Sequence, residues 1–161
     1  MRKFVKELVI WTFWIGFAAV ATQALNSFVL LNAQVVTGSM ESTIMTRDRV
    51  FGLRFFGDIS RGDIVVFDSP LPAQFSDPFV KRVIGLPGEK VAVVDGVLYI
   101  NDAPMPESYV SHAGRDFAPI VVPYGHYFVM GDNRDFSRDS REWGAICEGS
   151  IIGKIHIIFA P

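Results

Sequence analysis

The sequence predicts a mainly β protein, in which one N-terminal transmembrane helix precedes an antiparallel domain of the β-barrel or sandwich-like type. Two observations support this fold class. Residues 8–31 form a run of 24 residues without a charged side chain, and beyond residue 36 the chain divides into short runs rich in Val, Ile, Phe and Tyr. With 161 residues, the chain has room for one modest domain beside the helix.

The apolar run is long enough to cross a membrane, since 24 residues at about 1.5 Å each span a hydrocarbon core about 30 Å thick. Three basic residues stand among the first six positions, and basic residues favour the cytoplasmic side. We therefore expect a cytoplasmic N-terminus at residues 1–7, a single-pass anchor in the cell membrane at residues 8–31 and an extracytoplasmic domain at residues 32–161.

Two alternatives to a permanent anchor remain open. Ala19-Val20-Ala21 has the small-x-small pattern of a signal-peptide cleavage site, so the segment could be removed from the mature protein. The run could also be a buried core helix, although a domain of this size seldom hides 24 apolar residues in one helix. The apolar character resumes at residues 28–31, where a signal peptide would not need it, and this favours the anchor.

Seven runs beyond residue 36 are typical of strands. They are residues 49–55, 63–67, 79–84, 90–94, 97–100, 126–130 and 151–159. Asp95-Gly96 lies between the fourth and the fifth run and predicts a two-residue type I′ hairpin, in which both turn residues have positive φ. Residues 69–78 and 101–123 are rich in proline, and we expect them to be loops.

One predicted strand suggests a second contact with the lipid bilayer. Phe55 and Phe56 are adjacent, and neighbouring residues of a strand face opposite sides, so both rings cannot be in the core if the strand continues through them. We expect the exposed ring to contact lipid. Coverage of that ring by a neighbouring loop is the alternative.

Composition and charge exclude several function classes. Lys and Arg number 15 against 17 for Asp and Glu, so the net charge of −2 supplies no broad cationic field and disfavours a nucleic-acid partner. Cys147 is the one cysteine, which rules out an intramolecular disulfide and a four-cysteine zinc site. Because no calcium-loop spacing or histidine-rich cluster is present, we expect no metal site. The sequence does not indicate an oligomeric state.

Ser39 is a candidate nucleophile because it follows Gly38 soon after the apolar run. A serine after glycine is ordinarily a turn residue, so catalysis requires a base as well. Three histidines could complete a Ser-His-Asp arrangement, namely His112, His126 and His156. None of them lies in a distinctive motif, and a structural role is favoured for all three.

Lys81 is the stronger candidate base. On a strand it shares a face with Phe79 and Val83, and burial against an apolar face lowers the pKa of a lysine. With an ordinary pKa of about 10.4, only about one molecule in 2,500 would carry a neutral amine at pH 7. The alternative is that the aliphatic stem packs while the ammonium group reaches solvent.

Residues 131–141 contain three carboxylates and three guanidinium groups within eleven positions. Interleaved opposite charges favour a turn held by its own ion pairs and hydrogen bonds. Such a turn can place one hydroxyl group, such as that of Ser137, more accurately than a flexible loop can.

The order of these motifs resembles that of bacterial type I signal peptidases, the membrane-anchored Ser-Lys leader peptidases that remove signal peptides from exported proteins. Behind the anchor come GSMEST at 38–43, RGDIVVF at 61–67, KRVIGLPGE at 81–89 and GDNRDFSRDSR at 131–141. The resemblance implies a β catalytic domain of the signal peptidase type, substrates that are signal-peptide-bearing preproteins, and a serine endopeptidase without a metal or organic cofactor.

The resemblance also implies roles by position. Ser39 would be the nucleophile and Lys81 the general base, while the hydroxyl of Ser137 would orient the lysine amine. Asp139 and Arg141 would form the ion pair that holds the loop against the site.

Other residues would contact the substrate or its oxyanion. The oxyanion hole would consist of the backbone N–H of Ser39 and the hydroxyl of Thr37. Shallow apolar pockets for small residues at substrate positions −1 and −3 would be lined by Val35, Met40, Ile44 and Val80. The expected reaction is cleavage after Ala-x-Ala type sites through an acyl-enzyme.

One departure from the family pattern is Ser42, where proline is usual, so the loop lacks a φ fixed near −65° and we expect it to be more mobile. Two rival interpretations remain. A self-cleaving Ser-Lys protease of the repressor type has no use for a membrane anchor. An inactive anchored β module that binds preproteins or escorts another peptidase has no need of Ser39, Lys81 and Ser137 together.

Overall fold

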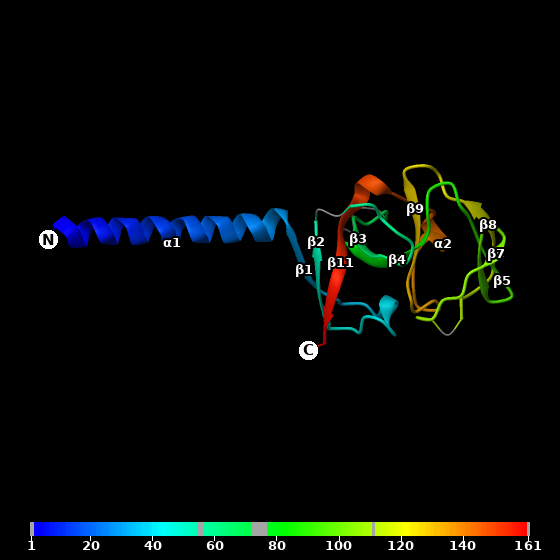
Figure 1. Ribbon diagram of the computed structural model, residues 1–161. Coiled ribbons are helices and arrows are strands. Elements are labelled where there is room, and N and C mark those ends of the chain that lie inside the picture. Colours follow the sequence, from blue (N-terminus) through cyan, green and yellow to red (C-terminus); the bar gives the residue numbers. More distant parts are fainter. Residues whose placement is uncertain (1, 55–56, 72–76, 111, 161) are drawn as a thin grey trace.

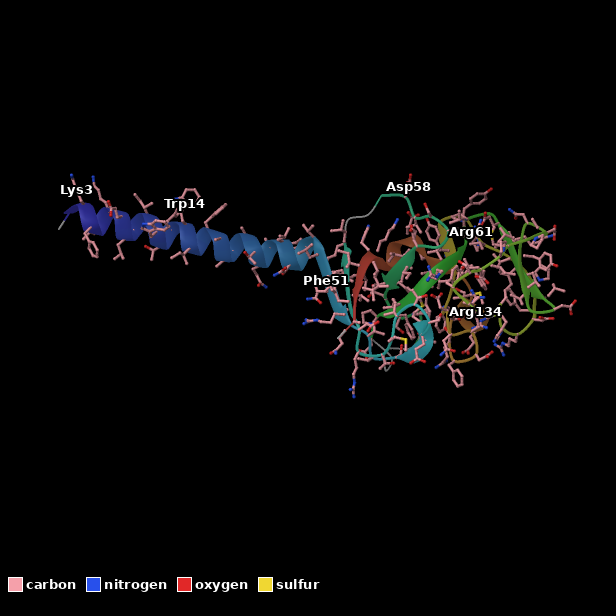
Figure 2. All side chains as sticks on the ribbon, turned by 60° about the horizontal axis from the view of Figure 1, so that its bottom comes forward. Lys3, Trp14, Phe51, Asp58, Arg61 and Arg134 are labelled. Atoms are coloured by element: carbon pink, nitrogen blue, oxygen red, sulfur yellow. The ribbon has the colours of Figure 1, made fainter. Side chains whose placement is uncertain are left out.

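The computed structural model describes residues 2–54, 57–71, 77–110 and 112–160 of the 161-residue chain. Helix α1 (Arg2–Phe28) extends away from a β domain that contains the rest of the described chain (Figure 1). Lys3 and Trp14 project from the helix with no other segment beside them (Figure 2), and none of its apolar stretch is buried. The core-helix alternative is therefore wrong, and the predicted fold class is confirmed.

The helix ends earlier than the sequence predicts. We expected it to continue to Leu31, but α1 ends at Phe28 and strand β1 (Leu30–Gln34) begins two residues later. Leu31 lies opposite Gly52 of β2 (Arg49–Leu53), and its side chain is only 4% exposed. The last apolar residues of the run are thus partly core residues of the β domain, because a leucine on an inner sheet face gains the same burial as one in lipid.

The larger sheet has seven strands in the order β1-β2-β11-β3-β4-β9-β10, with neighbours antiparallel. The strands beyond β2 are β3 (Ile64–Phe67), β4 (Phe79–Gly85), β9 (His126–Met130), β10 (Ile146–Cys147) and β11 (Ile151–Phe159). Bulges interrupt the pairing of β11 with β2 and β3 and that of β4 with β9. Bulges bend strands and increase their twist, which lets this sheet curl around its own core.

The smaller sheet lies at the end of the domain farthest from the helix (Figure 1). It contains β5 (Lys90–Val94), β6 (Val97–Ile100), β7 (Ala103–Pro104) and β8 (Phe117–Val121) in the order β7-β6-β5-β8. Asp95 and Gly96 join β5 to β6 with φ values of 50° and 71°. The predicted hairpin, with positive φ at both turn residues, is confirmed.

Two segments differ from the prediction or extend beyond the described residues. Residues 101–123 were expected to be a loop, but they include β7 and β8. Pro119 lies within β8, which an edge strand tolerates because the missing N–H is not needed on the outer side. The strand expected at 49–55 is β2, which ends at Leu53, while Phe55 and Phe56 lie outside the described residues.

Three apolar clusters hold the domain together, and two of them position the segments that matter below. One joins the sheets through Ile84 of β4, Val91 of β5 and Phe128 of β9. Another lies under β1 and β2 and includes Met40 and Ile44, which are 1% and 0% exposed. The segment between β1 and β2 is therefore anchored in the core on both sides of its exposed turn.

Candidate active site

Ser39 lies in a single 3-10 turn, η1 (Gly38–Met40), between β1 and β2. The side chain of Met40 anchors the turn in the apolar core, and the backbone N–H of Ile44 donates to the Met40 carbonyl over 2.8 Å. The turn is fixed from the side by Asn133, whose backbone N–H donates to the Ser39 carbonyl (3.1 Å) and whose Nδ2 donates to the Gly38 carbonyl (3.0 Å). The serine hydroxyl is therefore presented from a backbone held at three points.

Lys81 on β4 faces this hydroxyl. Its Nζ lies 2.5 Å from Ser39 Oγ, within hydrogen-bonding distance, although the two residues are 42 positions apart. The side chain is 2% exposed, and Nζ lies 5.6 Å from the centroid of the Phe79 ring. The ammonium group therefore does not reach solvent, unlike in the alternative considered from the sequence.

The surroundings of Lys81 change its acidity. Burial lowers the pKa of Lys81 from 10.5 to about 8, whereas the nearby carboxylates of Asp139 and Asp132 act in the opposite direction and the guanidinium of Arg141 again lowers the pKa. With a pKa of about 8, about one molecule in ten carries a neutral amine at pH 7. The amine is thus available as a base at neutral pH to a useful extent.

The three histidines hydrogen-bond elsewhere in the described structure. His112 Nε2 lies 3.2 Å from a carboxylate oxygen of Asp135. His126 and His156 each make a contact from Nδ1 to a main-chain carbonyl two residues earlier in the sequence. Among the described residues, no hydrogen bond joins any of them to Ser39, so Lys81 is the titratable group placed to accept its proton.

The 131–141 loop is held by a buried ion pair. Arg141 Nε and Nη2 donate to the two carboxylate oxygens of Asp139 over 2.8 Å each, and the side chains are 4% and 0% exposed. Burial would raise the pKa of Asp139, but hydrogen bonds and charge from Arg141, with the N–H of Gly131, hold it below its usual value. Asp139 also caps the short helix α2 (Ser140–Trp143) by accepting from the Arg141 N–H.

Ser137 lies beside the nucleophile turn but does not hydrogen-bond to the lysine in the described structure. Its Oγ donates to the Arg138 carbonyl over 3.4 Å. A Cβ added at Gly131 would lie 2.2 Å from Ser137 Oγ and 2.4 Å from the Ser39 carbonyl oxygen. Only glycine fits there, so Gly131 lets the loop close on the turn, and the orienting role of Ser137 stays a prediction.

An apolar cavity of about 660 Å³ leads to Ser39. Its walls come from β1 and the residues after it and from the start of β4, and they include Val35, Met40 and Val80. Ile44, the fourth residue expected to line the pocket, is 0% exposed and packs behind Met40, so it supports the wall and does not form it.

Thr37 lies at the rim of this cavity, where it precedes the 3-10 turn as its N-cap residue. Its Oγ1 lies 3.4 Å from Ser39 Oγ. Backbone N–H groups in the first turn of a helix lack intrahelical acceptors, which leaves that of Ser39 available to a ligand.

Sequence reasoning assigned no role to three polar residues that shape the site. Arg82 binds both carboxylate oxygens of Asp132 over 2.9 and 2.6 Å, and Asn133 holds the backbone of the nucleophile turn. All three lie inside the motifs quoted above, within two residues of Lys81 or Gly131. Their position in these motifs could have indicated a role in the site. The sequence does not show that Arg82 pairs with Asp132, 50 positions away.

A curled antiparallel domain behind an apolar helix, in which a serine that lines an apolar cavity lies against a buried lysine amine, is the arrangement expected of a membrane-associated hydrolase. The comparisons with known proteins narrow this class. Residues 8–160 match the family described as signal peptidase, peptidase S26, and the chain belongs to this family.

Proteins similar in sequence or structure are named signal peptidase I. The chain is 36% identical over 166 residues to signal peptidase I of Bacillus licheniformis, with 94% of this chain and 88% of that protein covered. It is 34% identical over 154 residues to the probable signal peptidase I-2 of Synechocystis, with 89% and 69% covered. A crystal structure of a signal peptidase I from Enterococcus faecalis aligns with a TM-score of 0.57 and 34% identity, over 63% of this chain and 100% of that one.

Proposed function

We propose that the chain is a membrane-bound serine endopeptidase that cleaves N-terminal signal peptides from exported preproteins after small residues, through an acyl-enzyme. Membership of the signal peptidase family supports the substrate class. The observation that carries the mechanism is the 2.5 Å contact between Ser39 Oγ and Lys81 Nζ at the end of the apolar cavity.

The reaction begins with a neutral Lys81 amine. It accepts the proton of Ser39 as the serine oxygen attacks the carbonyl carbon of the residue at −1, and the resulting ammonium then protonates the leaving amine. In the second half of the reaction the neutral Lys81 amine accepts a proton from a water molecule as its oxygen attacks the acyl carbon. The bond between that carbon and Ser39 Oγ then breaks, and the Lys81 ammonium returns the proton to Ser39. The oxyanion accepts hydrogen bonds from the backbone N–H of Ser39 and the hydroxyl of Thr37, and loss of one such donor costs about 2.7–4 kcal/mol of transition-state stabilisation.

The 131–141 loop keeps the two reacting groups in place. The bidentate pair of Asp139 and Arg141 fixes the loop, and Gly131 lets it lie against the Ser39 backbone. A rotation of the Ser137 side chain towards Lys81 on substrate binding would supply the orienting hydrogen bond. This role rests on the proximity of Ser137 to the turn.

The apolar lining of the cavity supports the proposed preference for small residues at −1 and −3. An extended substrate bound along its walls would place alternate side chains towards Val35, Met40 and Val80. These side chains are apolar and packed against the core, so each would offer a substrate side chain a fixed apolar contact, and we expect small residues to suit these contacts better than large ones.

Helix α1 would anchor the enzyme in the cell membrane in a single pass, with its N-terminus in the cytoplasm. The helix is exposed and apolar, and Lys3 lies at its far end from the β domain (Figure 2). Strands β1, β2 and β11 lie at the helix end of the domain (Figure 1), and Leu53, Ile157 and Phe159 expose apolar side chains there. These features support a lipid bilayer as the neighbour of this surface.

Cleavage by the full-length protein in detergent tests the proposal. Wild type should cut a preprotein carrying an Ala-x-Ala site and should be labelled at Ser39 by an acylating probe, whereas Ser39→Ala should do neither. Ser60→Ala, at an exposed serine, is the matched control and should behave as wild type. Normal cleavage by Ser39→Ala would contradict the proposed nucleophile, and a folded wild type that neither cleaves nor is labelled would indicate an inactive binding module.

A further inference from the structure

The segment between β7 and β8 runs from the smaller sheet to the candidate active site. Tyr109 on this segment contacts three parts of that site. The first contact is with the turn that carries Ser39. Ser42 Oγ donates to the Tyr109 carbonyl over 2.9 Å. Ser42 has a φ of 88°, which a proline cannot adopt and which non-glycine residues adopt rarely. The hydrogen bond therefore restrains the turn at the position where it lacks a proline.

The second contact is with the strand that carries Lys81. The guanidinium carbon of Arg82 lies 4.0 Å from the centroid of the Tyr109 ring, a stacking distance. Arg82 is the next residue after Lys81 on β4, and its guanidinium also binds Asp132. The residue after Asp132 is Asn133, which holds the backbone of Ser39.

The third contact is with the 131–141 loop. The Tyr109 hydroxyl donates to Glu107 Oε1 over 2.6 Å, and Glu107 accepts from Arg134 Nη1 and Nη2 over 2.8 and 2.5 Å. The side chains of Arg134 and Glu107 are 1% and 4% exposed. Arg134 Nε in turn donates to the Gly131 carbonyl over 2.9 Å, at the point where the loop meets the turn.

The Tyr109 hydroxyl stays protonated across the pH range of a cleavage assay. Burial, with the hydrogen bond and negative charge of Glu107, raises the pKa of Tyr109 well above its usual value of 10. The hydroxyl is therefore a permanent donor to a carboxylate that already accepts two bonds from Arg134, and it does not titrate with Lys81.

From these three contacts we propose that Tyr109 is a positioning residue for the peptide cleavage proposed above, on which this inference rests. Through its carbonyl, its ring and its hydroxyl it holds together the turn that carries Ser39, the strand that carries Lys81 and the 131–141 loop. Tyr109 does not line the cavity, so its effect is on the alignment of the reacting groups and not on the binding of the substrate.

Two variants separate the contacts. Tyr109→Phe keeps the ring on Arg82 and removes only the bond to Glu107, whereas Tyr109→Leu removes both. We expect kcat to fall about tenfold in Tyr109→Phe and up to about a hundredfold in Tyr109→Leu, since a misplacement of about 1 Å between reacting groups has an effect of this size. KM should stay at the wild-type value in both. Tyr124→Phe, at a tyrosine that is 87% exposed, is the control and should keep the wild-type kcat.

The readouts distinguish positioning from general stability. The full-length proteins are assayed in detergent on the same preprotein, and kcat is expressed per site labelled by the acylating probe, so that unfolded molecules are not counted. A wild-type kcat per labelled site in Tyr109→Phe, or a loss that appears only in KM, would overturn the inference even if Tyr109→Leu does not fold. Cleavage by wild type and its loss in Ser39→Ala are measured alongside, and their failure would count against the proposed function itself.

Ser42 tests the first contact separately. Ser42→Ala and Ser42→Gly both remove the hydrogen bond to Tyr109, but glycine suits a φ of 88°. If the bond positions the turn, both variants should lose kcat by a similar factor, about threefold to tenfold. A wild-type kcat in Ser42→Gly would show that only the backbone conformation matters, and would remove this contact from the inference.

Discussion

Replacing Lys81 by methionine should abolish cleavage and at the same time stabilise the fold. Lys81 is 2% exposed, and burial lowers its pKa from 10.5 to about 8. At about 1.4 kcal/mol for each tenfold change in a protonation equilibrium, this difference corresponds to about 3 kcal/mol of unfavourable free energy in the folded state at neutral pH. Methionine fills a similar volume without the charge, so most of this free energy should be recovered.

The gain should depend on pH. Below about pH 8 the lysine is protonated in both folded and unfolded chains, and the full penalty applies. Between about 8 and 10.5 the unfolded chain binds more protons than the folded one, so wild-type stability rises with pH and the penalty disappears. The advantage of Lys81→Met is therefore largest at pH 7 and small at pH 10.5.

Urea unfolding of the full-length proteins in detergent, at pH 7 and at pH 10, measures this difference. Lys90→Met is the matched control, since Lys90 is also on a strand but its side chain is 37% exposed and pairs with Asp102 at the surface. It should show no gain at pH 7. If Lys81→Met were less stable than wild type at both pH values, the desolvation of the lysine would not be the dominant effect, and the argument for a depressed pKa would fail.

Three further outcomes follow from the same geometry. Cleavage by wild type should rise about tenfold from pH 7 to pH 9 as Lys81 loses its proton around pH 8, and a flat rate between pH 6 and pH 9 would contradict its role as base. Asp139→Asn should lower the free energy of unfolding by about 3–5 kcal/mol, because it leaves the buried Arg141 guanidinium without its counter-ion, and thermal unfolding checks this. A preprotein with Phe at −1 should be cut at least about a hundredfold more slowly than one with Ala, and efficient cleavage of it would reject the pocket assignment.

Local patterns accounted for most of the strands. Four runs agree with the structure at both ends, because each lies between turn residues and carries β-branched or aromatic side chains on an inner face. Asp95-Gly96 fixed the hairpin, because few dipeptides accept two positive φ values in succession. Where the observed secondary structure differs from the prediction, contacts with the rest of the fold determine it. Leu31 could serve equally in a membrane helix or in a sheet, and Pro119 is compatible with a strand only at a sheet edge.

The sequence predicted only the parts of the candidate site that lie in recognisable motifs. The residue types at 39 and 81 suggested a nucleophile and a base, but their 2.5 Å separation depends on β4 passing beside the 3-10 turn. Tyr109 and Glu107 carried no signal, since they lie in a segment expected to be a loop and outside the quoted motifs. Ser42 was expected to loosen the turn, whereas its hydroxyl gives that turn a tether which a proline could not supply.

The arginines of the site have an electrostatic role that their ion pairs alone do not suggest. Two carboxylates raise the pKa of Lys81, and each is bound by its own arginine, Asp139 by Arg141 and Asp132 by Arg82. Without these partners, a free buried carboxylate would attract the lysine ammonium and stabilise its charged form. The guanidinium groups therefore neutralise the two carboxylates, so neither carboxylate serves as a counter-ion that would stabilise the charged form of Lys81. A rigid loop built from ion pairs and a lysine with a depressed pKa are compatible because both carboxylates have an arginine partner, Arg141 within the loop and Arg82 on β4.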